Sequence, residues 1–297
     1  MTSEHKKNRN LYHFFLTALY LIFALVYIYF LITGSNFYLT EINKRPHHSD
    51  YRSLRPAGSI GHGFGVIGSF LMIAMLSYSL RKRTRIFKNA GHLTHWLGFH
   101  IFCGIAGPLL VILHSSFKVQ GLIAVSFWSM IAVATSGILG RYIYLQIPRA
   151  ISGKELDLEE LQSTNISLAR QLKTEYKLND NDIEKIEEWY GIGTGEQKSL
   201  GLTLLFMITK DILRPVRLFK LRKRVSRKYN LPRSTIKKLL KIFERKVLLE
   251  RRISAWQAIH QMFHYWHVIH KPFAFIMYII MIIHILVAVY VGYIWIF

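Results

Sequence analysis

Two pairs of histidines are the residues of this chain best suited to chemistry. His100 and His114 lie in one long apolar segment, and His270 and His284 lie in another. The members of each pair are separated by the same interval, 14 residues. Neutral imidazole nitrogens bind transition metals, and imidazoles also transfer protons. The pattern therefore predicts metal ligation or proton transfer inside a membrane.

The shared interval has a geometrical meaning if both segments are helical. Fourteen residues at about 100° each return to within about 40° of the starting face, and at about 1.5 Å each they rise about 21 Å. Two such helices side by side present imidazole pairs at two depths, as two stacked haem groups require. If the helices run in the same direction, His100 pairs with His270 and His114 pairs with His284.

The cysteine count narrows the kind of redox centre. Cys103 is the only cysteine. A disulfide within the chain, a cysteine-ligated iron–sulfur cluster, a covalent C-x-x-C-H haem site and a cysteine zinc site are therefore excluded. A redox cofactor must have other ligands, and the chain offers 14 histidines.

The histidines also have competing interpretations. A lone histidine in a membrane helix is more often a packing or hydrogen-bonding residue than a ligand, but polar groups in lipid are costly and tend to be functional. His270 is the weakest candidate because it lies just before Lys271, near the expected membrane surface, and His264 or His267 is near enough to replace it. The main rival hypothesis is a haem-free scaffold or transporter whose histidines relay protons.

Two further residues are expected to contact a cofactor. His62, in the second apolar segment, is predicted at the depth of His114, where it could meet a quinone or a haem propionate. Arg141, at the end of the fourth segment, is predicted at the other level, where its cation could pair with a propionate. Ordinary snorkelling of the arginine is the alternative.

Several glycines lie near these histidines. Gly63, Gly65 and Gly68 spell G-x-G-x-x-G, but this copy lies inside an apolar segment with no preceding strand, so we expect close helix packing rather than a nucleotide site. Other small residues, including Gly98 and Gly107, are expected to let a flat macrocycle approach the backbone or simply to pack helices.

Long uncharged segments determine the predicted fold class. Residues 11–33, 57–80, 93–117, 121–139 and 272–297 carry no charged side chain. About 20 apolar residues in a helix cross the hydrocarbon core. The sequence therefore predicts an all-α integral membrane protein with five transmembrane helices. Residues 11–33 are longer than a signal-peptide core and have no A-x-A site behind them, which favours an uncleaved anchor.

The charges predict the orientation and the domains. The net charge is +22, concentrated at the N-terminus, at residues 81–88 and at residues 210–252. The positive-inside bias then places the N-terminus and residues 149–265 in the cytoplasm and the C-terminus outside, with a bacterial inner membrane as the expected location. The expected domains are residues 1–148 with spans one to four, a mostly helical basic cytoplasmic insert at 149–265, and residues 266–297 with span five.

The insert carries its own signals. Helix starts are expected at residues 153–160 and 179–188 with Ser and Asn caps, followed by a flexible patch at 191–201. Residues 202–208 are too short to span and are predicted to form an interfacial amphipathic helix. Residues 210–252 hold 17 Lys and Arg against three acids, which predicts contact with anionic lipid or steering of an acidic redox protein rather than nucleic-acid binding.

The His-x13-His pattern on two spans resembles that of membrane dihaem cytochromes b, in particular the ferric-reductase-like transmembrane domain and, more distantly, the cytochrome b561 group. The resemblance covers mainly spans three to five. It implies two non-covalent haem b groups with bis-histidine iron ligation and electron transport across the membrane.

The resemblance has departures that bear on function. Ferric reductases usually carry a flavin- and nicotinamide-binding domain after the last span, whereas this sequence stops at Phe297. The expectation is therefore a relay subunit of a redox complex or homo-oligomer, exchanging electrons with a quinone or a protein partner. A stand-alone ferric or quinone reductase is the alternative.

Overall fold

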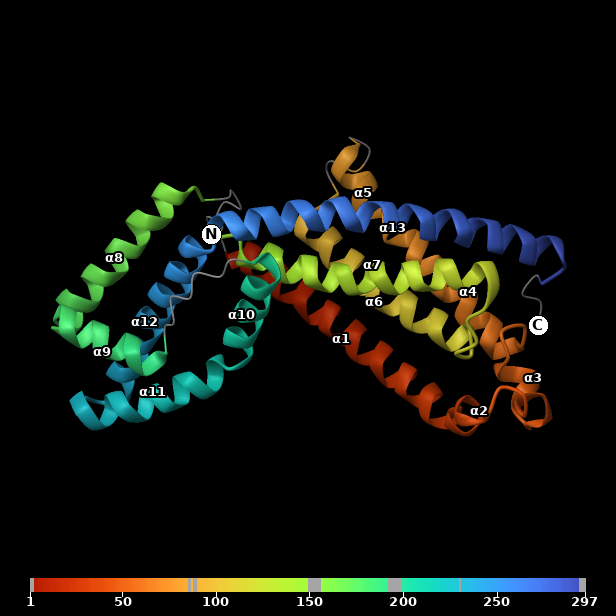
Figure 1. The fold of residues 1–297 in the computed structure, drawn as a ribbon, viewed down its shortest axis with the longest axis horizontal. Helices are drawn as coiled ribbons and strands as arrows, with labels where there is room; N and C mark the ends of the chain where they lie inside the picture. The colour runs from red at the N-terminus through yellow and green to blue at the C-terminus, as the bar shows by residue number, and fades with distance from the viewer. Residues whose placement is uncertain are drawn as a thin grey trace. The chain divides into compact units, whose positions relative to one another are not determined.

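The computed structural model describes residues 3–84, 87, 90–148, 156–191, 199–229 and 231–293, with the backbone alone at 3–10, 13 and 122. All regular structure in these ranges is helical (Figure 1). In chain order the elements are α1 (Ser3–Thr33), α2 (Ser35–Leu39), the 3-10 turn η1 (Arg45–His47), α3 (Tyr51–Leu54), α4 (Ser59–Ala74), α5 (Leu76–Arg83), α6 (Leu93–His114), α7 (Gly121–Gln146), α8 (Leu158–Tyr176), α9 (Asp180–Tyr190), α10 (Leu200–Ile212), α11 (Arg214–Tyr229), α12 (Arg233–Ser254) and α13 (Trp256–Tyr290).

Five helical segments in the described part of the chain are long and apolar enough to cross a membrane. They are Phe14–Thr33, Tyr51–Arg83, Leu93–His114, Ile123–Gln146 and Trp256–Tyr290. The predicted all-helical fold and the predicted number of candidate spans are thereby confirmed. With 35 residues, α13 is about 52 Å long. Because a hydrocarbon core is about 30 Å thick, part of α13 must project beyond it.

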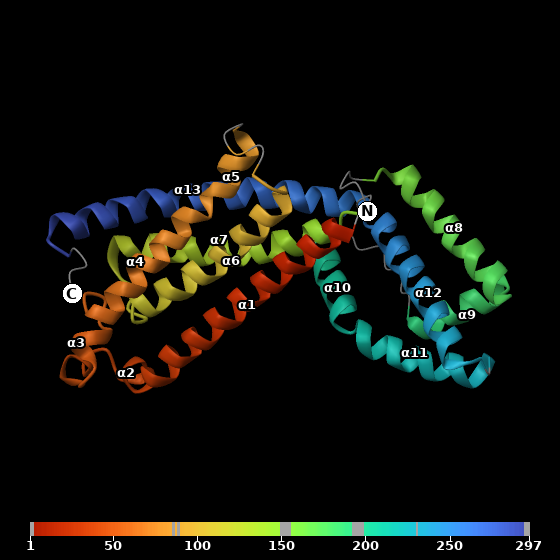
Figure 2. The same ribbon diagram turned by 180° about the vertical axis from the view of Figure 1, so that it is seen from behind.

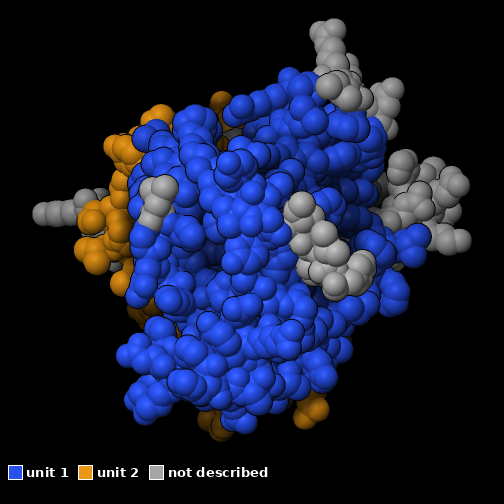
Figure 3. Space-filling view, turned by 90° about the vertical axis from the view of Figure 1, so that its right-hand side faces the viewer, with its two compact units in different colours: residues 1–139, 268–297 blue, residues 140–267 orange. Residues whose placement is uncertain are grey.

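The chain forms two compact units, which Figure 3 distinguishes by colour. Unit 1 comprises Met1–Leu139 and Val268–Phe297, and unit 2 comprises Gly140–His267. Helices α7 and α13 contribute residues to both units. The four histidines at the 14-residue spacing all belong to unit 1, and the basic residues 210–252 belong to unit 2.

The helices of unit 1 alternate in direction. Helices α1, α6 and α13 run one way, and α4 and α7 run the other way (Figures 1 and 2). The turn from α6 to α7 is tight, with positive φ at Ser116, Phe117 and Gly121. The equal direction of α6 and α13 is the arrangement in which His100 lies at the depth of His270.

Glycines allow α4 and α6 to pack closely. A Cβ added at Gly68 would lie 3.1 Å from the carbonyl oxygen of Gly107, and a Cβ added at Gly107 would lie 3.2 Å from that of Gly68. Small residues permit this kind of backbone approach between membrane helices. The glycine-rich run of α4 is therefore a helix-packing surface, as predicted.

The core of unit 1 is rich in sulfur. One buried cluster from α4, α6, α7 and α13, with the α4–α5 junction, contains Met72, Met75, Phe102, Cys103, Ala106, Met130, Met277 and Met281. The Tyr278 hydroxyl donates to the Met72 carbonyl at 2.5 Å, and the Ser126 hydroxyl donates to the Met277 carbonyl at 3.2 Å. Flexible thioethers fill irregular gaps well. Long side chains thus attach α13 to the helices around it.

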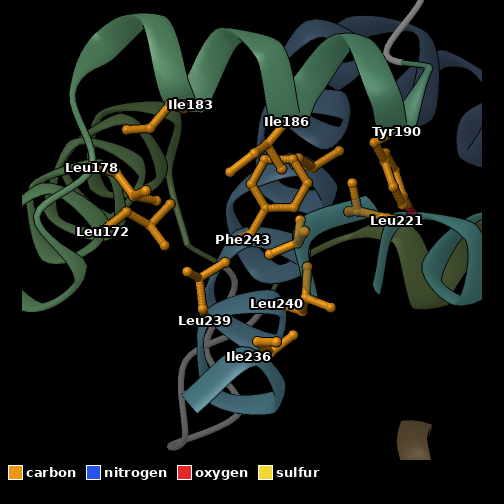
Figure 4. Close-up of a cluster of buried hydrophobic side chains, with 12 residues drawn as sticks. Leu172, Leu178, Ile183, Ile186, Tyr190, Leu221, Ile236, Leu239, Leu240 and Phe243 are labelled. Atoms are coloured by element: carbon orange, nitrogen blue, oxygen red, sulfur yellow. The ribbon is translucent and has the colours of Figure 1, made fainter. Parts of the chain in front are cut away.

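Unit 2 has a separate core. Side chains from the end of α8 and from α9, α11 and α12 converge around Phe243 (Figure 4). Helix α9 begins with a capping box at Asn179, as predicted. The cap of α8 is Asp157 rather than a serine, because its carboxylate accepts the Glu160 amide at 2.8 Å. Most of the predicted flexible patch, residues 192–198, lies outside the described residues.

Asp211 ties α10 to α7 and α12 within unit 2. Its carboxylate accepts from the Tyr142 hydroxyl at 2.7 Å, the Gln146 amide at 3.2 Å and the Arg251 guanidinium at 2.7 Å. Burial opposes ionisation of Asp211, but these hydrogen bonds and the charge of Arg251 outweigh it and lower the pKa of the carboxyl.

We expect Asp211→Asn to destabilise the attachment of α10 by about 1–2 kcal/mol, a value discounted for partial exposure. The folded-state pKa is depressed, so the contribution of Asp211 is present above its unfolded-state pKa and is lost as pH falls through the folded-state value. Hydrogen exchange of the α10 amides measures the change. Asp180→Asn is the control, because that carboxylate is 86% exposed and pairs only with Lys173 among the ion pairs of the described residues. Equal protection in both variants would show that the network is unimportant.

Candidate functional site

The ring of His100 is oriented by a backbone carbonyl of a neighbouring helix segment. Its Nδ1 lies 3.0 Å from the carbonyl oxygen of Met75, the residue between α4 and α5. A carbonyl oxygen can only accept, so Nδ1 of His100 must carry the proton and Nε2 must carry the lone pair.

His114 repeats this arrangement at the other end of α6. Its Nδ1 lies 2.9 Å from the carbonyl oxygen of Gly61, which again assigns the proton to Nδ1. Gly65 makes room for the ring, because a Cβ there would lie 2.6 Å from Nδ1 of His114. Gly61 and Met75 are themselves 14 residues apart. Helix α4 is antiparallel to α6. The carbonyls of Gly61 in α4 and of Met75 just after it are therefore spaced like His114 and His100 in α6.

His270 has the same tautomer for a different reason. Its Nδ1 lies 2.7 Å from Oγ of Ser136 on α7, and that hydroxyl lies 2.9 Å from the carbonyl of Val133, to which it donates. A serine hydroxyl has one hydrogen. With that hydrogen directed to Val133, Oγ accepts from His270, so Nε2 of His270 carries the lone pair.

The ring of His114 on α6 lies near the ring of His284 on α13. Their ring centroids are 6.5 Å apart, and their planes are inclined by 59°. Two imidazoles on opposite sides of one iron, with metal–nitrogen bonds of about 2 Å, place their ring centres roughly 6 Å apart. The separation in this structure is close to that value.

The four histidines define two levels of unit 1. His114 and His284 form the His114 level. His100 and His270 are held by separate partners, but equal intervals on helices of the same direction put them both about 21 Å away along the axes. They form the His100 level.

The two other predicted contacts have different outcomes. The ring centroid of His62 lies 6.5 Å from that of His114, so His62 belongs to the His114 level. Arg141 belongs to unit 2, where its guanidinium carbon lies 5.5 Å from the centroid of the Tyr144 ring. The structure thus brings His62 to the histidines of unit 1, and the contact expected of Arg141 stays a prediction.

The alternative ligands for the His100 level also belong to unit 2. They are His264 and His267, and His267 directs Nδ1 to the carbonyl of Phe263 at 2.9 Å. His260, which was not predicted as a ligand, directs Nδ1 to the carbonyl of Trp256 at 2.9 Å in the same way. These partners lie one turn back on the same helix. The Nδ1 hydrogen bonds of His100, His114 and His270 are different from these, because their acceptors lie in other segments of the fold.

The glycines beside the histidines serve helix packing. The space beside Gly98 is taken by the Tyr12 hydroxyl from α1, and that beside Gly107 by Met72 from α4. These contacts favour the helix-packing alternative for Gly98 and Gly107, and the approach of a macrocycle to the backbone stays a prediction.

Within the described residues, no group of three or more His, Cys, Asp or Glu side chains is arranged to hold a metal ion by itself. The histidines are instead arranged pairwise. No family model, curated protein or solved structure matches this chain. The role of the histidines is accordingly inferred from their own geometry.

Sequence reasoning missed the partners that orient the rings. The hydroxyls of span four could have been considered as a group, but Ser126, Ser129 and Thr135 lie there with Ser136 and the sequence does not distinguish between them. The Gly61 and Met75 carbonyls could not have been found, because every residue has a carbonyl and only the packing of α4 on α6 selects these two.

A folded segment covers the end of α6 that carries His114. Phe37, Tyr38 and Leu54 pack with Leu113 in one buried cluster. The segment is fixed by Arg45, which is 8% exposed. The Arg45 guanidinium donates to the carbonyls of Tyr38 at 2.7 Å, Thr40 at 2.8 Å and Ser116 at 2.5 Å.

Arg45→Ala should release this segment, because three carbonyls lose a charged donor and hydrogen bonds of that kind contribute about 1.5–3 kcal/mol each. Hydrogen exchange of residues 37–55 in nanodiscs should rise at least tenfold. Lys44→Ala is the control: Lys44 is 73% exposed and pairs with exposed Glu41, so little change is expected. Unchanged exchange in Arg45→Ala would show that other contacts hold the segment.

Proposed function

We propose that this protein carries electrons across a membrane through two b-type haems. His100 and His270 would ligate one iron, and His114 and His284 the other. The observation that carries the proposal is the shared tautomer of His100, His114 and His270, whose Nδ1 atoms all donate outside their own helix turn. Metal-bound histidines characteristically use the second ring nitrogen in this way.

The separation of His114 and His284 supports this cofactor at the His114 level, and the pairing of His100 with His270 rests on the equal intervals. Each level offers one imidazole from α6 and one from α13, and the His114–His284 separation of 6.5 Å suits opposite faces of one iron. The pairwise arrangement suits haem, because its porphyrin supplies the remaining ligands.

When bound, haem iron supplies a one-electron couple. The chain would set the orientation of the imidazoles through the Met75, Gly61 and Ser136 acceptors. Buried thioethers and aromatic rings of the unit 1 core exclude water between the levels. His62, whose ring lies 6.5 Å from that of His114, would hydrogen-bond a propionate or a quinone.

A relay subunit is favoured over a stand-alone reductase. The described residues contain no strand, whereas nicotinamide-binding βαβ units are built on strands. The proposed partners are a quinone or a redox protein, in a larger complex or homo-oligomer. The loop charges favour a bacterial inner membrane, with the N-terminus and the insert, residues 149–265, in the cytoplasm and the C-terminus outside.

The proposal is tested by removing one ligand from each level. The purified wild-type protein should hold about two haems, and His100→Ala and His284→Ala should each reduce this to about one, by pyridine haemochrome assay. The double variant should bind none. His260→Ala and His267→Ala are matched controls, because these rings bond within their own helix, and they should keep both haems. Full haem content in both ligand variants would refute the assignment.

A milder variant perturbs the His114 level alone and tests whether the two levels are independent. Gly65→Ala would push the His114 ring away from the Gly61 carbonyl, so the midpoint potential of one haem should shift while that of the other stays constant. Gly104→Ala is the control, because its added Cβ would make only an ordinary contact, 3.7 Å from Sδ of Met75. A shift of both potentials, or of neither, in a potentiometric titration would contradict the two-level arrangement.

A second candidate function has one specific observation in its favour. The rings of His62, His114 and His284 form a series with 6.5 Å between successive centroids, an arrangement that also suits a proton relay. A folded, colourless protein obtained under ample haem supply would favour that candidate.

A further inference from the structure

Helix α10 lies against the ends of two candidate membrane spans. Within unit 2, Met207 of α10 is 1% exposed and shares a buried cluster with Ile143 of α7, with Ile147 just after it, and with Ile259 and Met262 of α13. Both α7 and α13 are long and apolar enough to cross a membrane. Helix α10 therefore packs on the ends of α7 and α13 that belong to unit 2.

The other side of α10, continued by α11, is apolar and exposed. Leu202 and Leu205 are each 57% exposed, Ile212 is 69%, Val216 is 50% and Phe219 is 72%. In α10, Leu205 and Ile212 follow Leu202 at 3 and 10 residues, which places the three on one face of that helix. In α11, Val216 and Phe219 are 3 residues apart and share one face of that helix. An exposed apolar stripe of this length marks a surface that meets an apolar partner.

The same face becomes basic farther along α11. Lys220, Lys223 and Arg227 follow Val216 at 4, 7 and 11 residues, and all three are exposed. The opposite side of α11 packs into the unit 2 core through Leu221 and Val225, which are both 0% exposed. The helix holds eight Lys and Arg and no acid.

We propose that this α10–α11 face (Leu202, Leu205, Ile212, Val216, Phe219, Lys220, Lys223 and Arg227) lies on the bilayer surface and binds anionic lipid. The apolar half would enter the boundary between headgroups and acyl chains, and the basic half would contact lipid phosphates. The inference concerns unit 2 alone and does not depend on haem binding.

Lipid suits the face better than an acidic protein. The half that adjoins the spans offers Leu202, Leu205 and Ile212, which give an acidic partner no charge to meet. On its other side, α10 is buried through Met207 against the unit 2 residues of α7 and α13, two helices that are apolar enough to cross a membrane. The sequence predicted an interfacial amphipathic helix at residues 202–208. The proposed lipid-binding face includes exposed residues as far as Arg227.

Site-directed spin labelling of the full chain tests the proposal. Cys103 is the only cysteine and is fully buried, so Cys103→Ala gives a background free of other label sites. Labels are placed through Leu205→Cys, Phe219→Cys and Ser226→Cys, with Ser234→Cys as the control, since Ser226 and Ser234 are both exposed serines. The proteins are studied in nanodiscs of phosphatidylcholine alone or mixed with phosphatidylglycerol.

The proposal predicts that labels at 205 and 219 collide mainly with oxygen, which concentrates in lipid, and the label at 234 mainly with a water-soluble nickel complex. The label at 226 should become less accessible to nickel when phosphatidylglycerol is present. Combining Lys220→Glu, Lys223→Glu and Arg227→Glu should abolish that lipid dependence while the label at 205 stays in lipid.

Two results would overturn the proposal. Nickel-accessible labels at 205 and 219 in both lipid mixtures would show that the face is in water, and would point to a protein partner instead. A label at 226 that does not respond to phosphatidylglycerol would show that the basic half does not bind anionic lipid. Haem content enters neither readout, so failure here is distinguishable from failure of the electron-transfer proposal.

Discussion

The candidate site depends on the hydrogen bonds that Nδ1 of His100, His114 and His270 donates. An imidazole can ligate a metal only through a nitrogen with an available lone pair, and the partner of one ring nitrogen determines the state of the other. In this protein the carbonyls of Met75 and Gly61 fix the tautomers of His100 and His114, and the hydroxyl of Ser136 fixes that of His270. Without these acceptors the rings would have no fixed tautomer or direction.

The acceptors are available because of how the helices of unit 1 pack. Gly68 and Gly107 bring α4 close to α6, and Gly65 leaves room for the His114 ring beside the Gly61 carbonyl. Helix α13, in contrast, is joined to its neighbours through long side chains such as Tyr278 and the core methionines. Helix α6 thus packs closely on α4 and more loosely, through long side chains, toward α13. This difference would suit the proposed binding of haem between α6 and α13.

Much of this arrangement could be predicted from the sequence because it depends on periodic patterns. Uncharged segments predicted five candidate spans, the 14-residue interval predicted that His114 and His284 lie near each other, and Asn179 marked the start of α9. Features that depend on backbone atoms could not be predicted, since any residue can supply a carbonyl. The acceptors of Arg45 and His114 are of this kind. The packing of Tyr12 against Gly98 likewise depends on tertiary contacts.

The central claim is that two imidazole pairs hold two haems in unit 1. It is tested most directly by the haem content and spin state of the wild-type protein, purified in mild detergent after expression with ample haem. The account predicts about two haem b per chain by pyridine haemochrome, and an oxidised electron paramagnetic resonance spectrum of low-spin, bis-histidine iron. A well-folded protein without haem would contradict it, as would a spectrum dominated by high-spin iron.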